Sequence, residues 1–259
     1  MDLFEITSYI IVILLGWILG AIVNYLADVL PNKRRLVAPI CVKCESQQGY
    51  INYLLWPRRC AVCRHKRAGR TWWVEIAFSS VSLWLWIVQP SGINFVIGLV
   101  LFTYFGLVIV IDIEHKLILH PVSIVGGILG LFVGVSLHGL RATLLGGLAG
   151  FLIMLLLYFF GHLIMGWVSK RRGYDLQEEA LGFGDVNLGG VIGLILGWPG
   201  IIIGLILAVL LAGFFSLLYL LMKLLTKKYK PDLAIPYGPF LSISAILLIF
   251  FRDVILRIL

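Results

Sequence analysis

Long apolar runs fill most of this 259-residue chain and constrain its fold more than any other feature. Hydrophobic residues make up 61% of the sequence and charged residues only 13%, and the mean hydropathy is +1.02. A run of about 18 or more apolar residues is typical of a membrane-spanning helix. We place eight segments, at 7–27, 73–89, 93–113, 121–138, 142–168, 185–198, 199–224 and 237–256. The sequence therefore predicts an all-α polytopic membrane protein with about eight transmembrane helices.

Basic residues are unevenly distributed among the segments that join these runs. Residues 31–72 contain ten Lys or Arg and one acidic residue, Glu45. Because cytoplasmic loops of membrane proteins are enriched in Lys and Arg, we expect this loop to be cytoplasmic and both termini to lie outside. The net charge of +8 follows from this asymmetry. It is consistent with contact with the lipid bilayer and requires no nucleic-acid partner.

All four cysteines lie in this basic loop, as the pairs Cys41/Cys44 and Cys60/Cys63. Two Cys-x-x-Cys pairs are typical of a tetrahedral zinc site, because each tight turn directs two sulfurs at one ion. Two disulfides are the alternative, which a reducing cytoplasm disfavours. A four-cysteine site leaves no open coordination position, so we expect a structural Zn²⁺. The metal would stabilise a loop that is too small to form a large core.

Two aspartates lie at the ends of apolar runs. Asp112 ends the segment 93–113, and Asp185 begins the segment 185–198. An ionisable residue in a membrane segment is costly, so each is a candidate functional residue. Taken singly, either could instead reach the lipid headgroups or pair with a lysine. Counting the expected spans places both at the cytoplasmic face and at similar depth, which favours an acid/base pair.

Two short motifs accompany the aspartates on the same expected face. Gly182 and Gly184 precede Asp185 and allow close approach of the backbone. Pro236, Gly238 and Pro239 open the last segment, where the prolines remove backbone donors. Irregular backbone at membrane depth is tolerated where it is buried in protein or lines a cavity, so this motif is either a simple helix entry or a substrate-contacting loop.

Taken together, these motifs resemble the bacterial prepilin peptidase family, the type IV leader peptidases. The resemblance covers nearly the whole chain, and its elements follow the family's order. They are Gly20-Ala21-Ile22-Val23-Asn24, the two cysteine pairs, Arg70-Thr71-Trp72-Trp73-Val74-Glu75, Asp112-Ile113-Glu114-His115, Leu181-Gly182-Phe183-Gly184-Asp185-Val186 and Ile235-Pro236-Tyr237-Gly238-Pro239-Phe240-Leu241. Each motif alone is a weak signal, but the ordered set is specific.

The resemblance implies a membrane aspartic peptidase of the bacterial inner membrane with Asp112 and Asp185 as its catalytic residues. Such an enzyme removes the leader from prepilins and pseudopilins of type IV pilus and type II secretion systems, on the cytoplasmic side. Many members also N-methylate the new N-terminus with S-adenosylmethionine, and Glu75 is the residue that we associate with this cofactor. The implied domains are a first helix at 1–30, the zinc loop associated with methylation at 31–72 and the peptidase core at 73–259.

Other functions remain open at this point. One alternative is a protein with peptidase activity alone. In that case the Pro57-Arg58-Arg59 segment, which departs from the family's pattern beside the second cysteine pair, would have lost the methyltransferase activity. A proton- or cation-coupled transporter would use the two aspartates as an ion site. A zinc-binding adaptor would explain the cysteines but not the aspartates.

Overall fold

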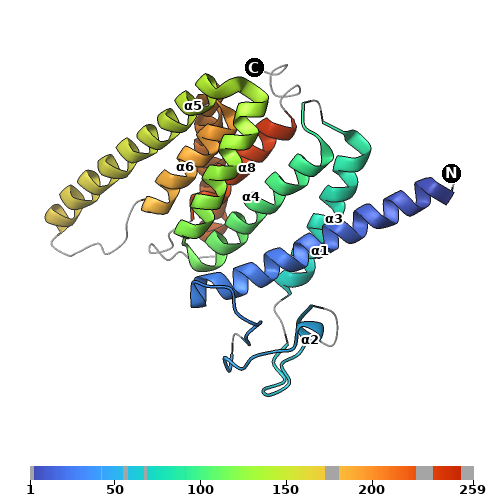
Figure 1. Cartoon of the computed structure of the whole chain (residues 1–259). Coiled ribbons are helices and arrows are strands. Elements are labelled where there is room, and N and C mark those ends of the chain that lie inside the picture. The colour runs from blue at the N-terminus through green and yellow to red at the C-terminus, as the bar shows by residue number, and fades with distance from the viewer. Residues whose placement is uncertain are drawn as a thin grey trace. The chain divides into compact units, whose positions relative to one another are not determined.

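In the computed structural model the described part of the chain is mainly helical. The structure describes residues 3–41, 43–54, 58–66, 69–90, 92–172, 181–225 and 236–251. The helices within these ranges are α1 (Leu3–Lys33), α2 (Tyr50–Leu54), α3 (Arg70–Val88), α4 (Phe95–His115), α5 (His120–Arg172), α6 (Phe183–Leu196), α7 (Gly200–Leu225) and α8 (Gly238–Phe250) (Figure 1). The described part of the chain contains isolated β-bridges but no named strand.

Each of the eight predicted apolar segments falls on a helix, so the predicted all-α polytopic fold class is confirmed. Among the described residues, five helices are long and apolar enough to cross a membrane: α1, α3, α4, α5 and α7. The helices α6 and α8 are apolar but shorter. The part of the last predicted segment beyond residue 251, and the C-terminus with it, lies outside the described residues.

The segments 121–138 and 142–168, which we expected to be separate spans, are joined in α5. Only Gly139 interrupts this 53-residue helix, with φ 78° and ψ 162°. Glycine adopts a positive φ without the steric penalty of a Cβ atom, so the chain bends here without a longer loop. The break divides α5 into a first arm, 120–138, and a second arm, 140–172.

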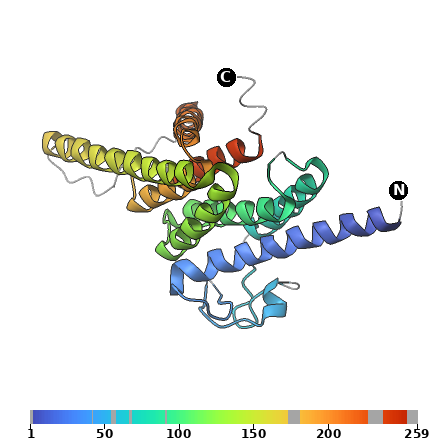
Figure 2. The same ribbon diagram turned by 45° about the horizontal axis from the view of Figure 1, so that its top comes forward.

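The chain separates into two compact units, Met1–Ile111 and Asp112–Leu259, with the boundary inside α4. In the first unit, α1 and α3 run antiparallel and in close contact (Figure 2). A methyl group at Gly16 would lie 2.6 Å from the carbonyl oxygen of Phe78, and one at Gly20 would lie 2.8 Å from Cα of Glu75. Small residues four apart thus allow the two backbones to approach, as is common between membrane helices.

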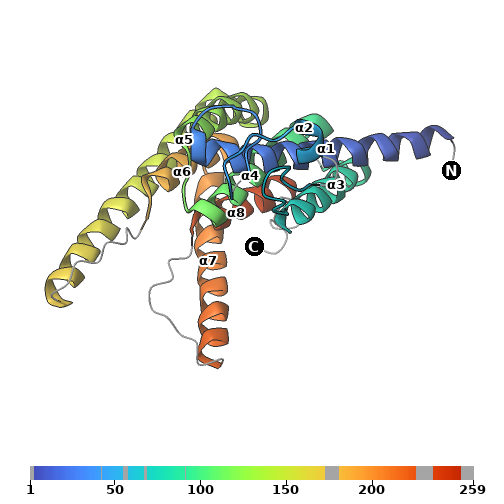
Figure 3. The same cartoon turned by 90° about the horizontal axis from the view of Figure 1, so that it is seen from below.

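In the second unit, α6 packs against both arms of α5 through glycines. Gly146 and Gly150 of the second arm face Gly193 and Gly189 of α6 so closely that side chains there would overlap the facing backbone. Figure 3 shows α7 and the second arm of α5 extending beyond the short helix α6. The helix α8 contacts both α6 and α7. This packing holds the beginnings of α6 and α8 in place, and these two helix ends carry the predicted glycine motifs.

Candidate functional site

Asp112 lies in the last turn of α4 and is only 5% exposed. The helix ends just beyond it because Lys116 adopts φ 50° while its N–H donates to the carbonyl oxygen of Asp112 at 2.9 Å. A positive φ cannot continue a right-handed helix. The chain therefore turns after Asp112 and returns through Ile118 toward the start of α5.

Asp185 lies in the first turn of α6 and is 9% exposed. Gly182 precedes the helix in an extended conformation, and its N–H donates to Oδ2 of Asp185 at 3.2 Å. The backbone N–H of Asp185 in turn donates to the carbonyl oxygen of Gly182 at 3.0 Å. Glycine has no side chain to accept the second bond of a capping box, so only the Asp185 carboxylate caps here, and its bond from Gly182 orients it at the helix N-terminus.

The two carboxylates and the two glycine motifs converge around Ile118. A methyl group at Gly184 would lie 2.8 Å from Cβ of Ile118. A methyl group at Gly238 would lie 2.5 Å from Oδ2 of Asp112 and 3.2 Å from Cδ1 of Ile118. Neither position has room for a side chain, so both must be glycine. At Gly238 the missing side chain lets the Asp112 carboxylate lie against the backbone at the start of α8.

Asp112 and Asp185 are near enough to interact electrostatically. One oxygen of each carboxylate, Oδ2 of Asp112 and Oδ1 of Asp185, is buried and has no hydrogen-bond partner among the described residues. A buried carboxylate oxygen without a partner is costly, so such atoms mark a place for water or another polar group. Two carboxylates this close cannot both ionise freely, so the pair can supply one acid and one base.

Pro236 and Pro239, the remaining residues of the second motif, flank this point. Pro239 occupies the first turn of α8, where its missing N–H costs no helical hydrogen bond. The structure thus brings Asp112, Asp185, Gly182, Gly184 and Gly238 together in the second unit.

The four cysteines form a separate cluster in the first unit. Their sulfur atoms all lie within 4.8 Å of one another, and the Cys41–Cys63 and Cys44–Cys60 pairs are 3.5 Å apart. The thiols are free. Tetrahedral zinc with Zn–S bonds of about 2.3 Å requires sulfurs about 3.8 Å apart, so the donor set and its spacing fit one zinc ion.

Both cysteine pairs are built by the same local turn. The N–H of Cys41 donates to Ser46, and the N–H of Cys60 donates to His65, at 2.9 and 3.0 Å. A residue with positive φ follows each pair, Glu45 at 54° and Arg64 at 55°. Isolated β-bridges close both turns. The two turns are therefore equivalent, and each presents two sulfurs to the same point.

Hydrogen bonding also differentiates the thiols. The backbone N–H of Cys63 and then the Ser46 hydroxyl lower the pKa of Cys60 to about 6. A hydrogen bond from the His65 backbone lowers the pKa of Cys63, but burial and the neighbouring thiols outweigh it and raise that pKa to about 12. Hydrogen bonding thus favours the thiolate form at Cys60 more than at Cys63. Metal binding would displace the remaining protons, because only the thiolate is a ligand.

Glu75 is 2% exposed in α3, and two side chains bind its carboxylate. Nη2 of Arg58 lies 2.8 and 3.0 Å from its two carboxylate oxygens, and Nε1 of Trp17 donates to Oε2 at 2.9 Å. The Arg58 guanidinium also lies 4.2 Å from the ring centroid of Trp72. Arg58 comes from the loop that carries Cys60, so a buried ion pair joins that loop to α3. The sequence analysis did not predict Arg58 as the partner of Glu75. The only signal for it was that an acidic residue in an apolar segment needs a partner of opposite charge.

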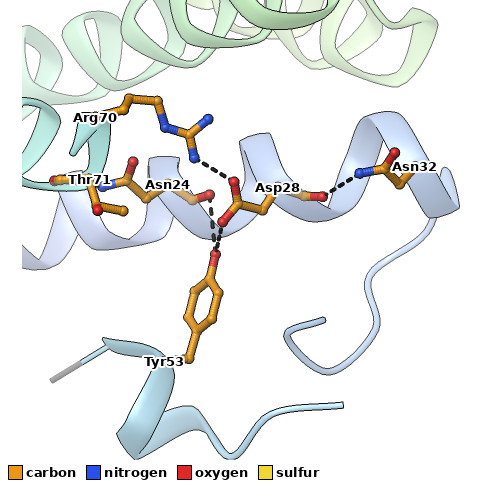
Figure 4. A network of polar contacts seen from close by, with 6 residues as sticks. All are labelled: Asn24, Asp28, Asn32, Tyr53, Arg70 and Thr71. Atoms are coloured by element: carbon orange, nitrogen blue, oxygen red, sulfur yellow. Dashed lines mark hydrogen bonds and ion pairs between the residues drawn. The ribbon is translucent and has the colours of Figure 1, made fainter. Parts of the chain in front are cut away.

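A second polar network joins the same loop to α1 (Figure 4). The hydroxyl of Tyr53 in α2 donates a hydrogen bond to Asp28. Nη2 of Arg70 forms an ion pair with Oδ1 of Asp28 at 2.5 Å. One turn earlier on α1, Nδ2 of Asn24 donates to the carbonyl oxygen of Thr71 at 3.1 Å. Tyr53 thus attaches the cysteine loop to α1, the Arg58–Glu75 pair attaches it to α3, and the contacts of Arg70 and Thr71 join α3 to α1.

Comparison with known proteins agrees with this picture. Residues 99–217 match the family model of the type IV leader peptidases. Three curated relatives are named prepilin leader peptidase/N-methyltransferase. They come from Aeromonas hydrophila (26% identical, 78% of this chain and 66% of the relative), Aeromonas salmonicida (25%, 80% and 67%) and Stutzerimonas stutzeri (26%, 75% and 63%). No solved structure matches the chain.

The matched region contains both aspartates but neither the cysteines nor Glu75. The chain spans about two thirds of the length of the curated relatives that it matches. The resemblance first indicated by the sequence motifs is therefore confirmed, since residues 99–217 match the type IV leader peptidase family model.

Proposed function

We propose that this protein is a prepilin leader peptidase of the bacterial inner membrane, with Asp112 and Asp185 as its catalytic pair. Its substrates are prepilins and pseudopilins, which it cleaves at the cytoplasmic face of the bilayer. The observation that carries this proposal is the convergence of two buried carboxylates from α4 and α6 at the start of α8. The names of the relatives supply the substrate class.

The chemistry follows from two carboxylates that share one proton. The ionised carboxylate takes a proton from water as the water oxygen attacks the scissile carbonyl carbon, and the protonated carboxylate donates its proton to the carbonyl oxygen. The resulting diol collapses as its C–N bond breaks. The carboxylate that gained a proton returns it to the leaving nitrogen, while the other regains the hydroxyl proton. Atoms and protons balance with water as the only co-reactant.

Burial supports this role for the pair. Each aspartate is at least nine-tenths buried, and each has one carboxylate oxygen with no partner in the described part of the chain. In a low-dielectric site, interactions with a developing charge are stronger than in water. Gly184 and Gly238 are required because they let three chain segments approach the carboxylates. Gly182, Pro236 and Pro239 position the adjoining backbone.

We further propose that the protein N-methylates the new N-terminus with S-adenosylmethionine, as the names of the relatives suggest. Zn²⁺ held by Cys41, Cys44, Cys60 and Cys63 would have a structural role, since all four positions would be protein ligands. Glu75 is engaged by Arg58 and Trp17. We therefore assign Glu75 to positioning the cysteine loop rather than to direct contact with the cofactor.

The test is incubation of the purified full-length protein with a purified prepilin, followed by mass spectrometry. Wild-type protein should shorten the prepilin, and with S-adenosylmethionine it should add about 14 mass units, the mass of one methylene group. Asp112→Asn and Asp185→Asn should each abolish shortening. Glu114→Gln, which changes an exposed carboxylate two residues from Asp112, is the matched control and should cleave normally. Full cleavage by either aspartate variant would remove that residue from the proposed pair.

A transporter or an adaptor would leave the prepilin intact in this assay. If the prepilin is shortened but never methylated in the presence of S-adenosylmethionine, the chain is a peptidase only. These outcomes separate the functions left open by the sequence.

A further inference from the structure

The helix α8, which begins at the aspartate site, carries a buried hydroxyl at Ser242. Ser242 is fully buried, and its Oγ has no hydrogen-bond partner among the described residues. Hydroxyls in helices ordinarily bond to the carbonyl oxygen three or four residues earlier. Ser244 does so, donating to Leu241 at 2.8 Å, although it is equally buried and lies on the same helix. Ser242 is therefore unusual among the serines of α8.

The register of α8 places Ser242 on the helix face that begins against Asp112. It lies four residues after Gly238, so the two share one face of α8, with their Cβ positions about 5–6 Å apart. A helical side chain leans toward the helix N-terminus and covers the preceding turn. In this case that turn is Gly238, whose Cβ position is 2.5 Å from Oδ2 of Asp112.

Three buried oxygens thus have no partner among the described residues: Oγ of Ser242, one turn after Gly238, together with Oδ2 of Asp112 and Oδ1 of Asp185. Leaving a polar atom unpaired in an interior is costly, and each such atom indicates a partner from outside the chain. A buried water makes about three hydrogen bonds. A hydroxyl and two carboxylates provide that number, with both donor and acceptor capacity.

We propose that the Ser242 hydroxyl is a third hydrogen-bonding group of the aspartate site and positions the water that the aspartates activate. This inference rests on the proposed peptidase function. The hydroxyl orients the water oxygen toward the scissile carbonyl, while the ionised carboxylate removes the proton. Its contribution is realised in the chemical step, so its loss lowers kcat more than it raises KM.

The experiment compares Ser242→Ala with Ser244→Ala in the purified full-length protein, with a purified prepilin as substrate. We expect Ser242→Ala to lower kcat about 10-fold or more with KM within about twofold, and to unfold at the same temperature as wild type or higher. A hydroxyl without a protein partner contributes little to stability, and alanine favours the helix. Ser244→Ala should show the reverse, with a lower unfolding temperature and nearly normal kcat, because it loses a bond to Leu241.

Normal kcat for Ser242→Ala would overturn the proposal. An equal loss of kcat in both variants would also overturn it, because it would indicate a general disturbance of α8. A lower unfolding temperature of Ser242→Ala would overturn it as well, because it would show that the hydroxyl bonds within the helix. If the wild-type protein itself does not shorten the prepilin, the peptidase function fails and this inference fails with it. That result is distinguishable because it does not depend on either serine variant.

Discussion

At the scale of single residues, two glycines set the geometry of the aspartate site. Gly184 and Gly238 lie where three segments meet, and neither position has room for a methyl group. The contact atoms at Gly184 include the backbone of Ile118, which cannot move aside as a flexible side chain can. The carboxylates are therefore positioned by missing side chains as much as by those that are present.

Replacing Gly184 or Gly238 by alanine should lower prepilin cleavage at least about 10-fold, since misplacement of a catalytic group by about 1 Å can cost about 100-fold. Gly213→Ala in α7 is the matched control, because a methyl group there meets no atom within 4 Å. Cleavage rates of the three purified variants check this prediction. Normal cleavage by Gly238→Ala would show that the Asp112 carboxylate does not need its place against α8.

At the scale of elements, the cysteine loop is attached to membrane helices by buried charge. Arg58 is 6% exposed and Glu75 is 2% exposed, so neither charge can be stabilised by solvent when its partner is removed. Breaking a buried pair by removing one partner typically costs about 3–5 kcal/mol. We expect Arg58→Ala or Glu75→Ala to lower the free energy of unfolding by about this amount in detergent.

The adjacent Arg59 provides the control for this ion pair. Its side chain is exposed, and Arg59→Ala removes the same charge from the same loop. Exposed substitutions usually change stability by about 0.5 kcal/mol or less. Equal destabilisation by Arg58→Ala and Arg59→Ala would mean that the loop's total charge matters, not the pair with Glu75.

Metal content is the other element-scale prediction. Freshly purified protein should contain about one zinc per chain, and removal by a chelator should make all four cysteines reactive toward alkylating reagents. Chelation should reduce methylation more than prepilin cleavage, because the aspartates lie in the other compact unit. Metal analysis and thiol alkylation measure the site independently of activity. A preparation without zinc, made without chelators, would contradict the assignment.

At the scale of the whole molecule, the basic loop predicts how the chain is oriented in the membrane. All four cysteines lie in that loop, so they report its side directly. After zinc removal, a membrane-impermeant thiol reagent should label inverted inner-membrane vesicles but not intact spheroplasts. The reason is that Lys- and Arg-rich loops remain on the cytoplasmic side. Labelling from outside the cell would reverse the expected topology and the proposed side of cleavage.

The helical fold and the cysteine cluster could be predicted because their signals are local. An apolar run long enough to cross a bilayer must satisfy its backbone hydrogen bonds internally, so it forms a helix wherever it lies. Likewise, two residues between cysteines place both sulfurs on one turn, as the equivalent turns at Cys41 and Cys60 show. Asp112 and Asp185 were identifiable for the same reason, since a carboxylate in such a run is conspicuous.

The sequence by itself thus determined the elements and which residue types are costly in them. Only the tertiary structure decided which residues meet: Gly238 against Asp112, Arg58 with Glu75, and both arms of α5 continuous through Gly139. It also distinguished Ser242 from Ser244, two buried serines whose difference is hydrogen bonding. Periodicity and motif spacing report interactions over a few residues. Contacts between distant segments depend on how helices pack, and in this chain glycines at the contact points set that packing.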